Sequence, residues 1–238
     1  MTRYKKKGFT LAEVLIVLGI IGVVAALSAP ALIQHANAAK TGPAMAKAIS
    51  VMTVGFNSYM QLNNADTINF AKASISKDPV KIFEELASGH IKIKKLSGSS
   101  PAVYKSVTGA SSVKNNQTMF EFPDKSVVIV PSSTCDSATG KVTTVDEEGQ
   151  TTENIPSTAG CQIYFMPMGY KNKARLMLGE DVFELSYNNN GEVLVYGLDY
   201  GTSWTEDCSD EKVANFTPAS DKSTCGGRIA AKGFKKDY

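Results

Sequence analysis

The sequence predicts an α+β protein in which a long N-terminal helix packs on the antiparallel β-sheet of a head. An apolar run, followed by apolar residues at helical spacing, fills the first quarter of the chain. Short runs rich in β-branched and aromatic residues, separated by turn residues, occupy residues 119–197. We therefore expect a leader over residues 1–8, a transmembrane helix over 9–33, an amphipathic continuation over 34–64 and a globular head over 65–238.

The apolar run is long enough to cross a membrane. Between Phe9 and Ile33 the only ionisable side chain is Glu13. At about 1.5 Å per residue this run reaches about 37 Å, which exceeds the roughly 30 Å of a hydrocarbon core. Basic residues precede the run and a polar sequence follows it, so the positive-inside rule places residues 1–8 in the cytoplasm. We expect a single-pass protein of the cytoplasmic membrane with an extracytoplasmic head.

An ordinary secretory signal peptide is the alternative interpretation of residues 1–38. Ala36-Asn37-Ala38 has the A-x-A pattern of a cleavage site, and cutting there would yield an exported or membrane-tethered binding protein or hydrolase. Two features argue against it. The apolar stretch after Glu13 is about 20 residues long, beyond the roughly 7 to 15 of a signal peptide, and a carboxylate has no purpose in a discarded segment.

The N-terminal motif resembles that of a known superfamily. Lys-Gly followed by Phe-Thr-Leu-x-Glu and an apolar run is similar to the signal of type IV pilins and type II secretion pseudopilins. The matched positions are Gly8, Phe9, Thr10, Leu11 and Glu13, and Pro30 stands where many type IV pilins have a helix-kinking proline. The resemblance implies a pilin-like fold and a structural subunit of a type IV pilus or type II secretion pseudopilus.

The same resemblance implies how the chain is processed and assembled. A prepilin peptidase would cut between Gly8 and Phe9 and methylate the new amino group of Phe9, leaving the apolar helix in place. Glu13 would neutralise the amino terminus of a neighbouring subunit. The implied partners are other pilin or pseudopilin subunits, the peptidase, and an inner-membrane assembly platform with a cytoplasmic ATPase. The filament would be extracellular or periplasmic, and the large, loop-rich head favours a minor subunit or a pseudopilin.

Beyond the apolar run, the helix continues with an amphipathic pattern. Apolar residues recur at helical spacing from Ala44 to Met60, while Thr41-Gly42-Pro43 predicts a kink or short break. A second, short helix is expected over residues 78–89, with Asp78 as N-cap and Gly89 at its end.

The predicted strands are separated by turn residues, among which Asn188–Gly191 is a hairpin signal. The expected strands are 119–123, 125–131, 161–167, 173–179, 181–187 and 191–197. The polar segment between Cys135 and Cys161 is expected to be an exposed excursion.

All cysteines lie in the second half of the chain, within turn-rich stretches. Of the three connectivities that four cysteines allow, we favour Cys135 with Cys161 and Cys208 with Cys225, because each pair closes a short loop. Disulfides imply an oxidising compartment outside the cytoplasm. The tail over residues 201–238 resembles, in its position, the disulfide-bounded C-terminal loop of many type IV pilins.

The sequence lacks the motifs of an enzyme or a cofactor site. It has no phosphate-binding glycine loop, no nucleophile elbow and no H-E-x-x-H pair, and His35 and His90 lie in no motif. Acidic clusters at residues 146–148 and 206–211 lack the spacing of a calcium loop, so we interpret them as solvated turns rather than metal sites. Beyond residue 8 the chain holds 21 basic and 23 acidic residues, which argues against a nucleic-acid partner.

Overall fold

The computed structural model describes the chain except for a set of segments and single residues. These are residues 1–9, 69–77, 106–110, 115, 133–141, 146–150, 155–159, 171–174, 189, 200, 202, 218–219 and 237–238. The chain divides into two compact units, Met1–Ala38 and Ala39–Tyr238.

The first helix, α1, spans Leu11–Leu62 and contributes to both units. The sequence predicted a kink or short break at Thr41-Gly42-Pro43. The predicted break is wrong, because the α-helix continues through all three residues. Thr41 and Gly42 are buried, and the backbone of Phe234 lies directly against Gly42. Packing against the C-terminal tail therefore outweighs the local preference of the tripeptide.

Within the head unit, one face of α1 is buried, as the apolar spacing predicted. The residues of this face in the core are Met45, Ala48, Met52, Phe56 and Met60. Each is separated from the next by three or four positions, which places all of them on one side of a helix. The amphipathic continuation is confirmed, and its apolar stripe forms one wall of the main core.

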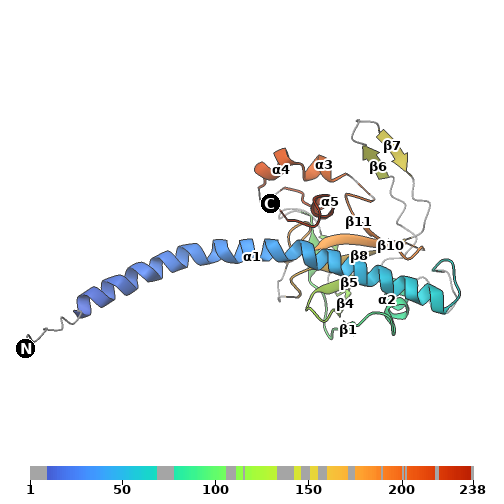
Figure 1. Cartoon of the computed structure of the whole chain (residues 1–238), viewed down its shortest axis with the longest axis horizontal. Coiled ribbons are helices and arrows are strands. Elements are labelled where there is room, and N and C mark those ends of the chain that lie inside the picture. Colours follow the sequence, from blue (N-terminus) through green and yellow to red (C-terminus); the bar gives the residue numbers. More distant parts are fainter. Residues whose placement is uncertain are drawn as a thin grey trace, which may run out of the picture. The chain divides into compact units, whose positions relative to one another are not determined.

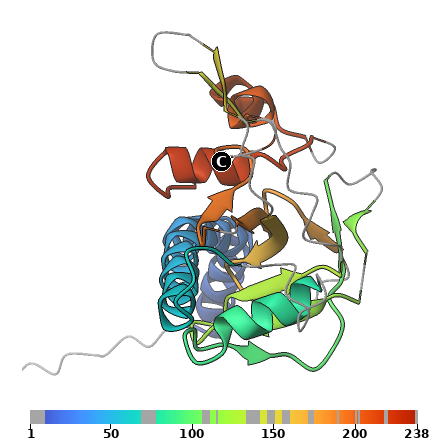
Figure 2. The same cartoon turned by 90° about the vertical axis from the view of Figure 1, so that its right-hand side faces the viewer.

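The second helix, α2, spans Pro79–Ala87 and is confirmed with its predicted boundaries. Asp78 Oδ1 accepts a hydrogen bond from the backbone N–H of Val80 at 3.0 Å, and Gly89 adopts φ +76° just past the end. Its buried face adjoins α1, where the rings of Phe83 and Phe56 meet edge to face at 6.2 Å. The two helices thus cover the same core (Figure 2).

A six-stranded antiparallel sheet forms the centre of the head (Figure 1). Its order is β1-β4-β5-β8-β10-β11, with bounds Lys94–Lys95, Thr118–Glu121, Val127–Val130, Gly160–Met166, Phe183–Asn188 and Val193–Val195. Five of the predicted strands lie here, and the α+β arrangement of a long helix on an antiparallel sheet is confirmed. The hairpin signal is confirmed too, since Asn188 Oδ1 accepts the N–H groups of Asn190 and Glu192, both at 3.0 Å.

Side chains alternate between the two faces of this sheet. On β8, Ile163 and Phe165 join the core beneath α1 and α2, whereas Tyr164 and Met166 point into a second core. Both faces are therefore covered, which explains why the central strands are almost wholly apolar.

A smaller sheet adjoins the second core. It has the order β3-β2-β9, with bounds Ser111–Val113, Ala102–Tyr104 and Arg175–Met177, and β2 pairs with β9 in parallel. The strand predicted over 173–179 therefore exists as β9 but lies outside the main sheet. Its membership was not predictable from its own residues, because its partner β2 is separated from it by about 70 positions along the chain.

The predicted excursion between Cys135 and Cys161 contains an unpredicted two-stranded hairpin. It consists of β6 (Val142–Val145) and β7 (Thr151–Asn154), which pair with each other in an antiparallel register. These strands pair with no other sheet among the described residues.

Three short helices occupy the tail that the sequence predicted only as turn-rich. They are α3 (Trp204–Asp207), α4 (Asp210–Ala214) and α5 (Cys225–Ala231). The first two are capped by the serine before each, Ser203 and Ser209. Helix α5 contacts α3, β10 and β11, so the tail packs at the β11 edge of the main sheet.

Candidate assembly site in the N-terminal helix

The start of α1 is closed by a reciprocal capping box. Glu13 Oε2 accepts hydrogen bonds from both the backbone N–H and the hydroxyl of Thr10, each at 2.8 Å. In return, the backbone N–H of Glu13 donates to Thr10 Oγ1 at 3.3 Å. Because the first turn of a helix has N–H groups without partners, this pair stabilises the point where the helix begins.

This capping box is a pairing within the candidate site that sequence reasoning missed. The signal was present, since Thr10-Leu11-Ala12-Glu13 has the S/T-x-x-E spacing of a capping box directly before an apolar run. The predicted role of Glu13 depended only on its charge. The structure adds that its carboxylate has hydrogen-bond partners within its own chain.

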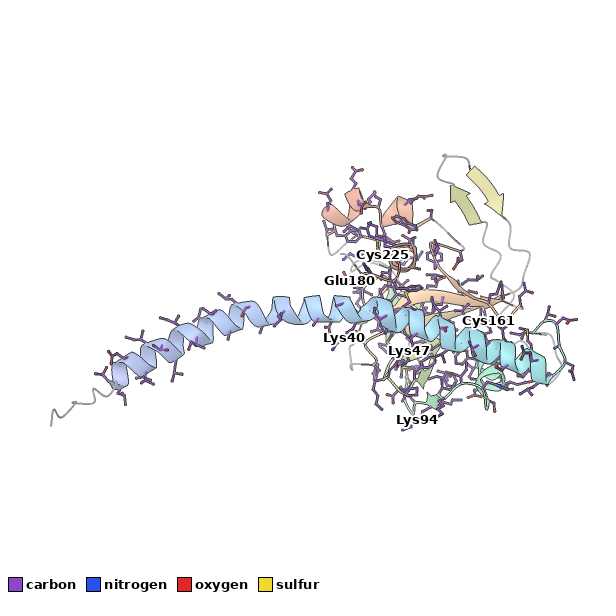
Figure 3. The ribbon with its side chains drawn as sticks, in the orientation of Figure 1. Lys40, Lys47, Lys94, Cys161, Glu180 and Cys225 are labelled. Atoms are coloured by element: carbon purple, nitrogen blue, oxygen red, sulfur yellow. A yellow bond between two sulfur atoms is a disulfide. The ribbon has the colours of Figure 1, made fainter. Side chains whose placement is uncertain are left out.

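The part of α1 that follows is apolar on every side (Figure 3). One helical stretch among the described residues, Leu11–Ala29, is long and apolar enough to cross a membrane. Its large apolar side chains have exposed fractions from 47% at Val14 to 79% at Leu11. A continuous apolar surface of this size is covered by lipid or by another protein, because the chain itself does not cover it.

The one hydroxyl group inside this span is satisfied within the helix. Ser28 Oγ donates to the backbone carbonyl of Val24 at 2.9 Å. Such bonding to the preceding turn removes the cost of placing a hydroxyl in an apolar environment. With Glu13 at its start and Ser28 near its end, the span contains no unpartnered polar side chain among the residues that the structure describes.

The other residues predicted for processing are placed only in part. Gly8 and Phe9, the predicted cleavage and methylation positions, lie outside the described residues. The backbone of α1 continues through Pro30. The kinking role of Pro30 therefore stays a prediction.

Comparison with known protein families decides what kind of N-terminus this is. Residues 3–29 match the model of the prokaryotic N-terminal methylation motif. The chain carries a prepilin-type signal. This signal is typical of type IV pilins and pseudopilins, and proteins with it are generally structural subunits rather than enzymes. No curated protein and no solved structure matches the chain.

The prepilin-type signal is followed by a head whose tail is cross-linked. Cys208 and Cys225 form a disulfide with a Cα–Cα separation of 5.2 Å, which confirms the favoured pairing of these two residues. Cys161 is also disulfide-bonded. Its expected partner, Cys135, lies outside the described residues, so this pairing stays a prediction.

A buried arginine holds the cross-linked tail in place. Arg228 on α5 is only 2% exposed, and its guanidinium donates to the carbonyl of Cys208 at 2.9 Å and to Asp210 Oδ1 at 2.6 Å. Lys232 donates to the same oxygen of Asp210 at 2.9 Å. Hydrogen bonds from Lys232 and then from Arg228 hold the pKa of Asp210 below its ordinary value.

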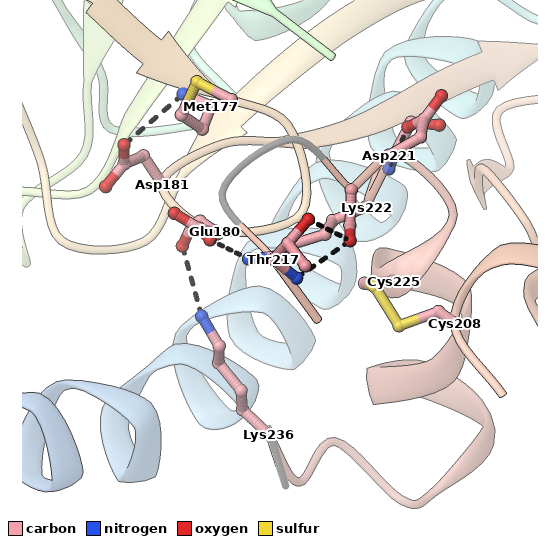
Figure 4. A network of polar contacts seen from close by, with 11 residues as sticks. Met177, Glu180, Asp181, Cys208, Thr217, Asp221, Lys222, Cys225 and Lys236 are labelled. Atoms are coloured by element: carbon pink, nitrogen blue, oxygen red, sulfur yellow. Dashed lines mark hydrogen bonds and ion pairs between the residues drawn. A yellow bond between two sulfur atoms is a disulfide. The ribbon is translucent and has the colours of Figure 1, made fainter. Parts of the chain in front are cut away.

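The tail is also tied to the turn after β9 (Figure 4). Lys222 forms an ion pair with Glu180, and Lys236 Nζ donates to the backbone carbonyl of Glu180 at 3.3 Å. The segments on both sides of α5 are therefore fixed to the same turn.

The acidic clusters and the histidines form no metal centre in the described part of the chain. No group of three or more His, Cys, Asp or Glu residues there could hold a metal ion. The cluster at residues 146–148 lies outside it. His90 is half-buried against the ring of Tyr59, at 6.2 Å and edge to face.

Proposed function

We propose that this protein is a structural subunit of a type IV filament system, a pilin or pseudopilin, inserted in the cytoplasmic membrane before assembly. The observation that carries the proposal is the direct succession of a prepilin-type signal and an apolar helical span that the chain leaves uncovered. A span of this kind serves equally as a membrane anchor and as the core of a bundle of identical helices. The attached head, a helix on an antiparallel sheet, supports the same proposal.

In this proposal, a prepilin peptidase cuts between Gly8 and Phe9 and methylates Phe9. The cut lies before the apolar span, so the mature subunit keeps its anchor. The basic leader, with Arg3, Lys5, Lys6 and Lys7, stays on the cytoplasmic side. The head then stands outside the cytoplasm, in an oxidising compartment that suits the disulfide of Cys208 and Cys225.

Glu13 has two roles in the proposed cycle. In the single subunit its carboxylate caps the helix through Thr10. During assembly, the same carboxylate faces the cationic amino terminus of a neighbouring subunit, which offsets the cost of a charge in the membrane. An assembly platform with its own cytoplasmic ATPase would supply the energy, and the size of the head favours a minor subunit or a pseudopilin.

The mass of the mature protein tests the processing. Intact-mass analysis of the chain purified from its native membrane should give a polypeptide that starts at N-methylated Phe9. A polypeptide that starts at Ala39 would instead identify an ordinary signal peptide and overturn the proposal.

A pair of variants separates the two roles of Glu13. Glu13→Gln keeps an oxygen that can accept the hydrogen bonds of Thr10 and loses the charge, whereas Glu13→Ala loses both. We expect normal processing of both variants and loss of both from filaments sheared from native-host cells. Normal assembly of Glu13→Gln would refute the role of the charge and leave only the cap.

A further inference from the structure

A shallow apolar groove with a basic rim lies beside the head portion of α1. It is a hollow of about 290 Å³ whose floor includes Val51, Ile91 and Phe122. Lys47 and Lys92 lie at its edge. An adjoining hollow of about 350 Å³ shares Lys92 and Phe122 and is bordered by Lys94. We call the two together the β1 groove, because Lys94 belongs to that edge strand.

The charge of the β1 groove is positive after its internal pairs are counted. Its two carboxylates are already engaged, Asp124 with Lys47 at 3.0 Å and Glu121 with Lys125 at 2.8 Å. Lys92 and Lys94 are exposed, and neither forms an ion pair in the part of the chain that the structure describes. An apolar floor with two uncompensated lysines favours an occupant that combines apolar and acidic side chains.

The chain carries such a surface at the opposite edge of its sheet. Helices α3 and α4 present Glu206, Asp207 and Glu211, none of which forms an ion pair among the described residues. Lys212 offsets one of these three charges, and Val213 adds a partly exposed apolar side chain. We call these two helices the acidic arm.

The acidic arm is held rigidly, which favours binding because little order has to be gained. The disulfide of Cys208 and Cys225 joins the end of α3 to the start of α5, and Arg228 donates to the carbonyl of Cys208. Asp210, the first residue of α4, is bound by Arg228 and Lys232. The free carboxylates therefore project from a fixed base.

The position of the two surfaces decides which contacts they can make. β1 is one edge strand of the main sheet, and the acidic arm packs through α5 on β10 and β11 at the other edge. Figure 1 shows β1 and the α3–α4 pair at opposite sides of the head, and Figure 3 shows Lys94 and Cys225 on opposite sides of α1. An arm cannot reach the groove of its own chain, so the contact has to join two copies.

We propose that the β1 groove of one subunit binds the acidic arm of the next subunit in the filament. Because the two surfaces differ, the contact is heterologous, and a pair of bound subunits keeps one free groove on one copy and one free arm on the other. Repetition produces an open chain rather than a closed dimer. This inference rests on the proposed function. It adds a specific contact between the heads of neighbouring subunits.

Charge reversal in the full-length chain, expressed in its native host, tests the contact. Lys92→Glu with Lys94→Glu, or Glu206→Lys with Glu211→Lys, places like charges opposite each other. Each double variant should lower the yield of sheared filaments about tenfold, and the quadruple variant, with both surfaces reversed, should recover it. The matched control is Lys105→Glu with Lys114→Glu, which makes the same change of charge at exposed residues that belong to neither the β1 groove nor the acidic arm, and should assemble normally.

Cysteine cross-linking supplies a readout that does not depend on yield. Filaments of a Lys94→Cys, Glu211→Cys variant should give a ladder of oxidised dimers and higher multimers, and the single variants should give none. Filaments without a ladder, or no recovery in the quadruple variant, overturn the contact and leave the proposed function intact. A different result would assign the groove to a polyanion instead. In that case the wild type would bind a DNA fragment, and Lys92→Glu with Lys94→Glu would abolish this binding while filaments still assembled normally. Absence of filaments from the wild type overturns both proposals.

Discussion

Gly42 of α1 lies directly beneath the backbone of Phe234 in the C-terminal tail. A Cβ atom at position 42 would overlap the carbonyl group of Phe234. Phe234 itself has φ +59°, so the tail is bent at the point where it crosses the helix. The contact connects residues almost 200 positions apart and joins the first helix of the head to its last segment.

Gly42→Ala should destabilise the head by about 1–3 kcal/mol, because the backbone of the tail has to move to admit a methyl group. Alanine is the better helix former, so a purely local effect would have the opposite sign. The free energy of unfolding, measured by urea titration of the full chain in detergent micelles, checks this. Ser50→Ala, at an exposed position of the same helix, is the control and should change stability little. A stabilised Gly42→Ala variant would contradict the close contact.

Replacing Cys208 and Cys225 by alanine should lower the stability of the head by about 2–4 kcal/mol, because the disulfide closes a short loop in the unfolded chain. Trp204, the single tryptophan, lies on α3 beside the bridge and reports local unfolding by its fluorescence. Ala231→Ser, at the exposed end of α5, serves as control. Equal urea midpoints for the double variant and the wild type would show that the bridge adds nothing.

The stability of the head should fall in acid, in part because Asp210 loses its charge. Its pKa is lowered in the folded state, so the carboxylate stabilises the head above its unfolded pKa of about 3.9. This contribution is lost as the pH falls through the lower, folded value. Asp210→Asn should therefore be less stable than the wild type at pH 7, and the difference should shrink below about pH 4. Urea midpoints at pH 7 and pH 3 check this, with Asp207→Asn as the neighbouring control. A difference that is the same at both pH values would exclude the charge of the Asp210 carboxylate as its source.

Thr10→Val should loosen the first turn of α1, because the hydroxyl of Thr10 is both donor and acceptor in the capping box. The expected cost is about 1 kcal/mol, equivalent to roughly fivefold faster amide exchange at residues 11–13. Hydrogen exchange followed by NMR in micelles measures it. Thr10→Ser retains the hydroxyl and should behave as the wild type. Unchanged exchange in Thr10→Val would show that the hydroxyl of Thr10 does not stabilise the first turn. The cap would then depend on the hydrogen bond from the backbone N–H of Thr10 to Glu13.

The strands show where sequence reasoning succeeds and where it ends. Runs such as 125–131 and 181–187 became β5 and β10 because β-branched and aromatic residues between turns encode a strand locally. The run 173–179 also became a strand, β9, but it pairs with the distant β2. Local pattern predicts that a strand forms, and it does not predict its partner.

The tail illustrates a different limit. Its helices α3 and α4 have four and five residues, too few to show a helical period in the sequence. They are held by the disulfide and by contacts of buried Arg228, which join residues 17 and 20 positions apart and therefore lie beyond the reach of a local helical pattern. Short helices of this kind depend on tertiary packing more than on propensity.

By itself, the sequence determined the prepilin-type signal, the membrane-length span after Glu13 and the pairing of Cys208 with Cys225. It also determined that a long N-terminal helix is followed by a set of β-strands. These features depend on neighbouring residues or on short loops. Only the tertiary structure decided that α1 runs unbroken past Gly42, that β9 leaves the main sheet, and that the β1 groove and the acidic arm lie at opposite edges. Each of these depends on contacts between distant segments, and burial in such contacts outweighs the weak conformational preferences of single residues.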